Sequence, residues 1–188
     1  MFPAYNSSTG WIEVICGSMF SGKTQELIRR LRLAMIAKQK VQVFNSSLDT
    51  RYGASHVISH DKVKIPCQAV RRSGDILRLV KKDTQVVGID EVNFFDPYIV
   101  NVCQKLARAG KRVVVAGLDQ DYRGRPFMVT AKLLALSEYV TKNLAICMTC
   151  GSPANHSQRL SHSKARIEVG AADKYEARCR KCFKPEKS

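Results

Sequence analysis

The segment of residues 17–24, with the sequence GSMFSGKT, has the composition of a phosphate-binding loop. It follows the apolar run 11–16 and precedes a stretch with helical periodicity, which predicts a loop between a strand and a helix. Its glycines allow backbone angles that let successive amide N–H groups point at a phosphate. Lys23 supplies a charge for phosphate oxygens, and the Thr24 hydroxyl can hold Mg²⁺. The positive end of the helix dipole favours the same ligand. The expected phosphate-binding residues are Gly17, Ser18, Met19, Phe20, Ser21, Gly22, Lys23 and Thr24.

Two acidic residues, Asp90 and Glu91, follow the apolar run 86–89. At the carboxyl end of a strand beside the phosphate loop, Asp90 would face the hydration shell of Mg²⁺. Glu91 could accept the proton of an attacking hydroxyl or water. Alone, the pair is also consistent with acids that end a strand and begin a loop. Combined with the phosphate loop, the pair predicts an enzyme that acts on a nucleoside triphosphate.

Four of the seven cysteines form two C-x2-C pairs, Cys147 with Cys150 and Cys179 with Cys182. Four thiolates so arranged predict a structural zinc site, because no coordination position is left for a reacting water. The alternatives are four reduced thiols without a metal, and a thioredoxin-like redox pair outside its usual βαβ context. Zinc would close the base of the long loop 151–178, which is too polar to form a core of its own.

The elements that must position these residues alternate between strands and helices, as in a mostly parallel sheet. Strands are predicted at 12–16, 41–45, 86–89 and 113–116, with helices at 25–38 and from Pro97 to Arg108. We expect an α/β fold with a P-loop domain at 11–145 and a small zinc-binding domain at 146–183. Residues 1–10 are expected to form a flexible lead-in and 184–188 a tail.

The overall composition restricts the class of protein. Apolar residues make up 45% of the 188, and no run is long enough to span a bilayer. Residues 1–10 show no secretory signal, so we expect a cytoplasmic protein without a membrane partner. The net charge of +15 would fit nucleic acid, but the Lys and Arg residues are spread along the chain. The charge alone does not identify a partner.

The motifs together resemble the type II thymidine kinases. The resemblance rests on the phosphate loop, on DEVNFF at 90–95, on GLDQDYRGRPF at 117–127 and on the two cysteine pairs, all in order and spacing. It covers nearly the whole chain and implies a RecA-like sheet, a zinc-bearing lasso over the nucleoside and a homotetramer. The implied reaction is phosphoryl transfer from ATP to the 5′-hydroxyl of thymidine or deoxyuridine, with dTTP as feedback inhibitor.

The resemblance also implies roles for individual residues. Glu91 would be the general base, and Asp49 and Arg51 would lie near Mg²⁺ and the phosphates. The lasso backbone near residues 170–175 would hydrogen-bond the pyrimidine edge. The implied nucleoside-binding residues are Met19, Phe94, Leu118, Tyr122, Ser157, Gly170, Ala171, Ala172, Asp173 and Tyr175. Without the family, the aromatic members of this set would be taken for ordinary core residues.

Four positions depart from the family pattern: Ser18, Asn45, Asn93 and Ala171 stand where Pro, Lys, Gln and Gly are usual. Asn93 is one methylene shorter than Gln, so we expect any hydrogen bond that it forms to need a shifted backbone. A zinc-ribbon ATPase that binds nucleic acid is the alternative function. Against it, no set of aromatic and Arg residues forms a base-stacking platform, so no specific nucleic-acid partner is expected.

Overall fold

A parallel β-sheet forms the centre of the molecule in the computed structural model, which describes residues 9–47, 56–58, 64–160 and 174–185. Its six strands lie in the order β5-β2-β6-β7-β1-β8, and all five neighbouring pairs are parallel. The strands are β1 (Trp11–Gly17), β2 (Val41–Ser46), β5 (Gln68–Val70), β6 (Val86–Ile89), β7 (Arg112–Leu118) and β8 (Tyr139–Asn143). The expected mostly parallel α/β fold is therefore confirmed.

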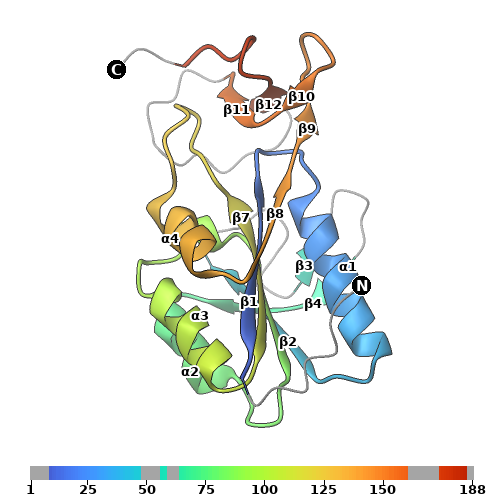
Figure 1. Ribbon diagram of the computed structural model, residues 1–188, viewed down its shortest axis with the longest axis vertical. Coiled ribbons are helices and arrows are strands. Elements are labelled where there is room, and N and C mark those ends of the chain that lie inside the picture. The colour runs from blue at the N-terminus through green and yellow to red at the C-terminus, as the bar shows by residue number, and fades with distance from the viewer. Residues whose placement is uncertain (1–8, 48–55, 59–63, 161–173, 186–188) are drawn as a thin grey trace.

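Helices cover both faces of this sheet, α1 on one face and α2, α3 and α4 on the other (Figure 1). Their bounds are α1 (Lys23–Ile36), α2 (Ser73–Leu79), α3 (Ile99–Arg108) and α4 (Met128–Leu136). The helix expected at 25–38 begins two residues earlier, directly after Gly22 in the left-handed conformation (φ 77°). Lys38 is itself left-handed (φ 59°), which ends the helix.

The sheet divides the hydrophobic core into two layers, because successive side chains of each strand point to opposite faces. On β7, Val113 and Val115 pack under α3 and α4, whereas Val114 and Ala116 pack under α1. Gly88 of β6 allows α1 to approach closely, because a Cβ atom there would lie 2.6 Å from the Leu31 side chain. This contact places α1, and with it the phosphate loop, tightly against the sheet.

A buried ion network joins α1 to the adjacent strands β1 and β7 of the sheet. Glu13 of β1 is 1% exposed, and its carboxylate accepts hydrogen bonds from Arg30 of α1 (2.8 Å) and Arg112 of β7 (2.6 Å). The Trp11 indole N–H donates to the same carboxylate at 2.8 Å. Burial raises the pKa of Glu13, but the hydrogen bonds from these three neighbours outweigh it and hold the pKa below its usual value.

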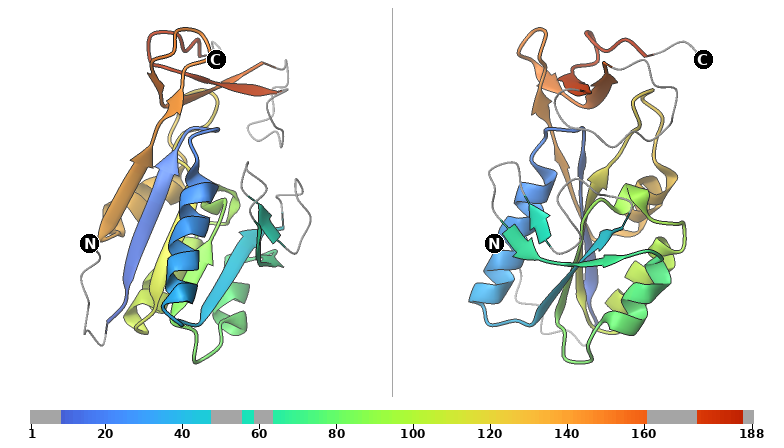
Figure 2. Two further views of the ribbon diagram at one scale, coloured as in Figure 1. Left: turned by 90° about the vertical axis from the view of Figure 1, so that its right-hand side faces the viewer. Right: turned by 180° about the vertical axis from the view of Figure 1, so that it is seen from behind.

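The remaining strands form small pairs outside the main sheet. Strands β9 to β12 lie beyond the carboxyl ends of the central strands, at the top of Figure 1, and Figure 2 shows this end from two further sides. The bounds of these strands are β3 (His56–Ile58), β4 (Lys64–Pro66), β9 (Ala145–Ile146), β10 (Pro153–Ala154), β11 (His156–Arg159) and β12 (Tyr175–Arg178). A single turn of 3-10 helix, η1 (Val92–Phe94), follows β6.

Within the described ranges, no helix is both long and apolar enough to cross a bilayer. The division into domains at residue 146 stays a prediction, although a separate small cluster of buried residues surrounds the cysteines.

Candidate functional site

The phosphate loop lies between β1 and α1, as the sequence predicts. Gly17 has φ 146°, and a Cβ atom there would lie 2.2 Å from the carbonyl oxygen of Asn143, so only glycine fits. The loop curls around Lys23, whose Nζ donates to the Ser18 carbonyl at 2.7 Å, and the Ser21 hydroxyl donates to the same oxygen at 2.8 Å. The Lys23 ammonium group and the N-terminal amides of α1 thus both lie at the phosphate loop.

Asp90 lies at the end of β6, within reach of the phosphate loop. The Thr24 hydroxyl donates to its carboxylate at 3.1 Å. Burial, reinforced by the neighbouring carboxylate of Glu91, raises the pKa of Asp90 to about 7. Hydroxyl and carboxylate oxygens are the ligands that Mg²⁺ prefers, and a cation would stabilise the charged form of Asp90. The donor set therefore fits Mg²⁺.

Glu91 occupies an unusual backbone position directly after Asp90. It adopts the left-handed conformation (φ 48°, ψ 45°), which side chains other than glycine and asparagine rarely adopt. Its amide N–H donates to the Asp90 carboxylate at 2.9 Å, and the η1 turn begins at the next residue. Such local strain is concentrated at functional sites in proteins. Glu91 as a whole residue is half-buried beside the buried Asp90, and its carboxylate oxygen Oε2 is buried.

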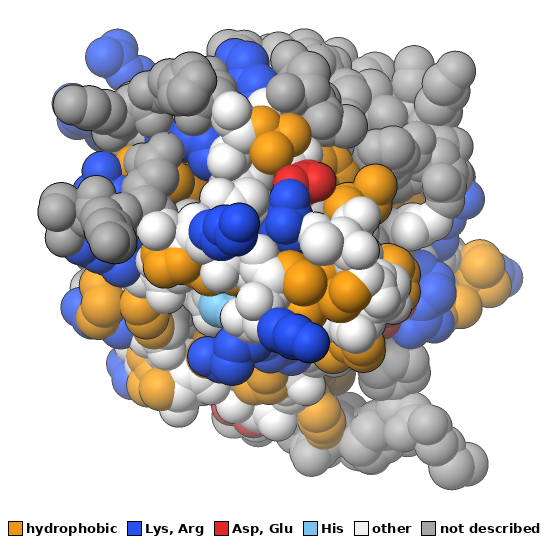
Figure 3. Space-filling view, turned by 90° about the horizontal axis from the view of Figure 1, so that it is seen from above, with side chains coloured by type: hydrophobic (Ala, Val, Ile, Leu, Met, Phe, Trp, Pro, Cys, Tyr) orange, Lys and Arg blue, Asp and Glu red, His pale blue; other side chains and the backbone are white. Residues whose placement is uncertain are grey.

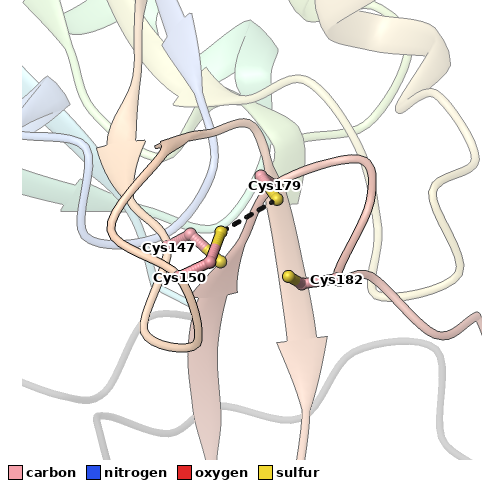
Figure 4. Close-up of side chains that lie close together, drawn as sticks. All are labelled: Cys147, Cys150, Cys179 and Cys182. Atoms are coloured by element: carbon pink, nitrogen blue, oxygen red, sulfur yellow. Dashed lines mark hydrogen bonds between the residues drawn. The ribbon is translucent and has the colours of Figure 1, made fainter.

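The four predicted metal ligands, Cys147, Cys150, Cys179 and Cys182, meet in one cluster. Figure 4 shows their side chains facing one another from the loop after β9 and the segment after β12. All four sulfur atoms lie within 4.8 Å of one another, and Cys150 Sγ is 3.6 Å from Cys179 Sγ. Tetrahedral Zn–S bonds of about 2.3 Å place sulfur atoms about 3.8 Å apart, so the cluster fits a zinc ion.

Three of the residues implied for the nucleoside, Met19, Phe94 and Leu118, lie around the carboxyl ends of β1, β6 and β7, and each is half-buried. Asn93, which the sequence analysis noted only as a departure, connects two of these segments. Its side-chain oxygen accepts the Leu118 amide at 2.8 Å, so the shorter side chain does form a hydrogen bond. Through this hydrogen bond Asn93 holds η1 against the end of β7.

Tyr122 lies on the loop after β7, which Asp121 holds in a tight turn. The Asp121 carboxylate accepts the amides of Arg123 (2.9 Å) and Arg125 (3.0 Å), as in an Asx-turn. The Tyr122 ring itself is 3% exposed. Arg159, which the sequence analysis did not name, stacks on this ring.

Strand β11 connects the zinc-bearing end to the phosphate loop. The Ser157 hydroxyl accepts the Met19 amide at 3.0 Å, and Ser157 pairs with Ala177 of β12. Tyr175 begins β12 opposite Arg159, and both are buried. Alternation along β11 places Arg159 on the same side as Ser157, and this signal in the sequence could have pointed to Arg159.

Six predicted site residues lie outside the described residues: Asp49, Arg51, Gly170, Ala171, Ala172 and Asp173. Their roles stay predictions. The other predicted residues gather at the carboxyl end of the sheet. Seen from this end, Lys and Arg side chains outnumber acidic ones on the visible described surface (Figure 3), which suits anionic substrates.

Comparisons with known proteins agree with this arrangement. A family model described as thymidine kinase matches residues 10–183. A thymidine kinase of Rhodothermus sp. (strain ITI 518) is 56% identical over 181 residues, which cover 96% of this chain and 84% of the relative.

Two solved structures are distantly similar. Domain III of the Thermotoga maritima replication initiation protein DnaA is 15% identical, with a TM-score of 0.43 over 70% of this chain and 54% of that chain. The Pif1 helicase of Candida albicans is 14% identical, with a TM-score of 0.42 over 71% of this chain and 36% of that chain. Similarity at this level identifies no function. The family match spans nearly the whole sequence and includes every motif described above, and the chain therefore belongs to the thymidine kinase family.

Proposed function

We propose that the chain transfers the γ-phosphoryl group of ATP to the 5′-hydroxyl of thymidine or deoxyuridine, giving the monophosphate and ADP. The observation that carries this proposal is the hydrogen bond from Thr24 to Asp90 (3.1 Å), which joins the phosphate loop to the acidic strand end in a member of the thymidine kinase family. Beside this pair stands Glu91, in a strained backbone conformation. A phosphate site and a carboxylate base adjacent to it are what phosphoryl transfer to a hydroxyl needs.

ATP would bind with its phosphates in the loop of residues 17–24. Lys23 would contact the β- and γ-phosphate oxygens, and Thr24 and Asp90 would hold Mg²⁺, which neutralises charge on these oxygens when bound. A groove of about 560 Å³ begins at the phosphate loop and runs along α1. It is lined by Ser21, Gly22, Gln25, Glu26, Ile28, Arg29, Arg32, Leu33 and Asn143. Because this groove is continuous with the phosphate loop, we assign to it the nucleoside part of ATP.

Glu91 would act as the general base. The 5′-oxygen attacks the γ-phosphorus while the bond to the bridging β–γ oxygen breaks, and the 5′-hydroxyl proton passes to the Glu91 carboxylate. Position and charge contribute more to this reaction than covalent help, so the fixed backbone of Glu91 matters as much as its basicity.

The nucleoside would lie between the carboxyl ends of β1, β6 and β7 and the hairpin of β11 and β12. Met19, Phe94 and Leu118 offer half-buried apolar surface there, and the aromatic rings of Tyr122 and Tyr175 close the zinc-bearing side. Zinc at the four cysteines would hold this hairpin in place, because the buried cluster around it is small. Lasso positions 170–173 and the loop positions Asp49 and Arg51, which lie outside the described residues, belong to the same proposal.

Family resemblance supports three further proposals: a homotetramer, feedback inhibition by dTTP and a cytoplasmic location. The division into a P-loop domain (11–145) and a zinc-binding domain (146–183) is part of the same account. The nucleic-acid-binding ATPase considered from the sequence is not favoured, because the family match covers residues 10–183.

The test is ATP-dependent phosphorylation of thymidine, with deoxyuridine, deoxycytidine and deoxyadenosine assayed in parallel. We expect turnover of the first two nucleosides only. An assay of ATP hydrolysis with and without single-stranded DNA, at low and moderate salt, addresses the alternative. Stimulation of hydrolysis by DNA without phosphorylation of any nucleoside would contradict the proposed function.

A further inference from the structure

We propose that Arg159 is a positioning residue that fixes the two aromatic side chains of the nucleoside pocket, Tyr122 and Tyr175, and thereby sets the affinity for the nucleoside. This inference rests on the function proposed above. It assigns a role in substrate binding to a buried arginine that is itself no ligand of the phosphates.

The contacts of Arg159 with the two tyrosines are direct. Its guanidinium carbon lies 3.6 Å from the centroid of the Tyr122 ring, within the distance of a stacked cation–π pair. On its other side, Nη2 donates to the Tyr175 hydroxyl at 2.7 Å and Nε donates to it at 3.2 Å. The exposed fractions of Arg159, Tyr122 and Tyr175 are 4%, 3% and 6%, so all three contacts are shielded from water.

The three side chains come from three segments of the chain. Tyr122 lies on the loop after β7, Arg159 ends β11 and Tyr175 begins β12, where it pairs with Arg159 across the hairpin. The two hairpin strands are adjacent, whereas the loop after β7 extends from a strand of the central sheet (Figure 1). Arg159 is therefore a connection between the zinc-bearing hairpin and the loop that carries Tyr122.

The orientation of the Tyr122 ring depends on what stacks against it. Within the described residues, its hydroxyl is buried and has no hydrogen-bond partner. Face contacts must then fix the ring, and Arg159 at 3.6 Å lies much closer than Arg123 at 5.1 Å. Loss of the planar group above the ring would leave Tyr122 free to rotate into the space.

The chemistry of this position requires arginine in particular. A guanidinium group can stack its flat face on one ring while its edge donates two hydrogen bonds to a neighbouring hydroxyl. A lysine ammonium has no such plane, so it cannot form both contacts at once. The cation–π stack and the charge-assisted hydrogen bonds also offset the cost of burying the charge.

The expected effect is confined to the nucleoside. Arg159 is two residues beyond Ser157, on the same side of β11, and Ser157 already joins this strand to Met19 of the phosphate loop. The loop that binds ATP is held by its own contacts around Lys23 and Asp90, which Arg159 does not share. Removal of the guanidinium group should therefore change the binding of thymidine and leave the binding of ATP nearly unchanged.

The experiment compares the full chain with Arg159→Lys, Tyr175→Phe and the double variant. The KM values for thymidine and ATP, kcat, zinc content and Tm are measured for each, and thymidine affinity is measured separately by calorimetry. Arg178→Lys is the matched control, because Arg178 belongs to the same hairpin but forms its ion pair with Glu176. The wild-type turnover of thymidine, measured first, tests the proposed function independently of Arg159.

For Arg159→Lys we expect the KM for thymidine to rise about tenfold to hundredfold, with a change of less than about twofold in the KM for ATP. Tyr175→Phe removes the acceptor of the two hydrogen bonds and should raise the same KM by a smaller factor. The double variant should be little worse than Arg159→Lys, because both substitutions disrupt one connection.

Two outcomes would overturn the assignment while wild-type turnover is normal. One is an unchanged KM for thymidine in a folded, zinc-containing Arg159→Lys protein. The other is a parallel rise in both KM values with loss of zinc, which indicates a purely structural role. If Arg159→Lys does not fold, a Tyr175→Phe protein with unchanged thymidine affinity would overturn it equally.

Discussion

The Ser157 hydroxyl accepts a hydrogen bond from the backbone amide of Met19 at 3.0 Å. This contact joins two segments far apart in the sequence, the zinc-bearing hairpin and the phosphate loop. Both residues belong to the proposed nucleoside pocket. The hydrogen bond therefore holds together the two parts that line the pocket, the hairpin and the phosphate loop. Binding of the nucleoside and order of the hairpin should therefore depend on each other.

Replacement of Ser157 tests this connection. Ser157→Ala leaves the Met19 amide without its acceptor, and we expect the KM for thymidine to rise about threefold to tenfold. Ser157→Thr retains a hydroxyl at the same position and should behave nearly as the wild type. Steady-state kinetics with thymidine as the varied substrate measure both variants. Equal KM values for the alanine and threonine variants would contradict the connection.

The end of β7 packs against the η1 turn that follows Glu91, the proposed general base. A Cβ atom at Gly117 would lie 2.7 Å from the Asn93 side-chain oxygen and 2.8 Å from a methyl group of Val92. Gly117→Ala should therefore displace η1 and the adjacent Glu91, and a displacement of about 1 Å can lower kcat about a hundredfold. Gly74→Ala is the control, because its Cβ atom would meet nothing closer than 3.7 Å. A full kcat in a folded Gly117→Ala enzyme would show that η1 tolerates the shift.

The buried carboxylate of Glu13 should contribute strongly to stability. Glu13→Gln removes the buried carboxylate that pairs with Arg30 and Arg112, and we expect a loss of about 3–5 kcal/mol in the free energy of unfolding. Asp83→Asn, which disrupts the exposed pair with Lys40 outside this network, should leave the free energy of unfolding nearly unchanged. Urea denaturation at neutral pH measures both.

The pH dependence of this contribution has a defined sign. The pKa of Glu13 is lower in the folded chain than in the unfolded chain. Its contribution is therefore complete above the unfolded pKa of about 4.3 and is lost as the pH falls through the lower, folded pKa. The difference in unfolding free energy between wild type and Glu13→Gln should shrink below about pH 4. A difference that stays constant down to pH 3 would contradict the assignment.

Zinc should be required for nucleoside affinity but not for the sheet. Cys150→Ser removes one of four ligands, and we expect loss of the metal and a large rise in the KM for thymidine, since the hairpin carries Ser157 and Arg159. Cys67→Ser, outside the cluster, should retain one zinc per chain. Metal analysis and circular dichroism measure the two effects. Retention of full thymidine affinity by a zinc-free protein would contradict this role.

Motifs made of contiguous residues were predictable from the sequence. Local residue spacing is enough to predict three features: the phosphate loop, the strand before Asp90 and the two cysteine pairs. The structure places all three as expected. The site roles of these residues stay predictions, and those at Asp49, Arg51 and 170–173 lie outside the described residues.

Contacts that depend on packing were not predictable in this way. Glu13 stands in an apolar strand, and its buried charge is explained by two arginines distant in the sequence, Arg30 and Arg112, together with the nearby Trp11. Arg159 is one of many arginines in a basic chain, and its role becomes visible only when Tyr122 and Tyr175 are brought beside it. Asn93 is shorter than its family counterpart, yet the approach of Leu118 supplies its hydrogen bond.

The central claim is that Glu91 removes the proton of the nucleoside 5′-hydroxyl, and kcat of Glu91→Gln tests it most directly. Glutamine keeps the shape of the side chain but is not a base, so kcat for thymidine should fall about a hundredfold to ten-thousandfold while thymidine and ATP still bind. Zinc content and Tm serve as the controls for folding. A kcat within about threefold of wild type would contradict the assignment of Glu91 as general base.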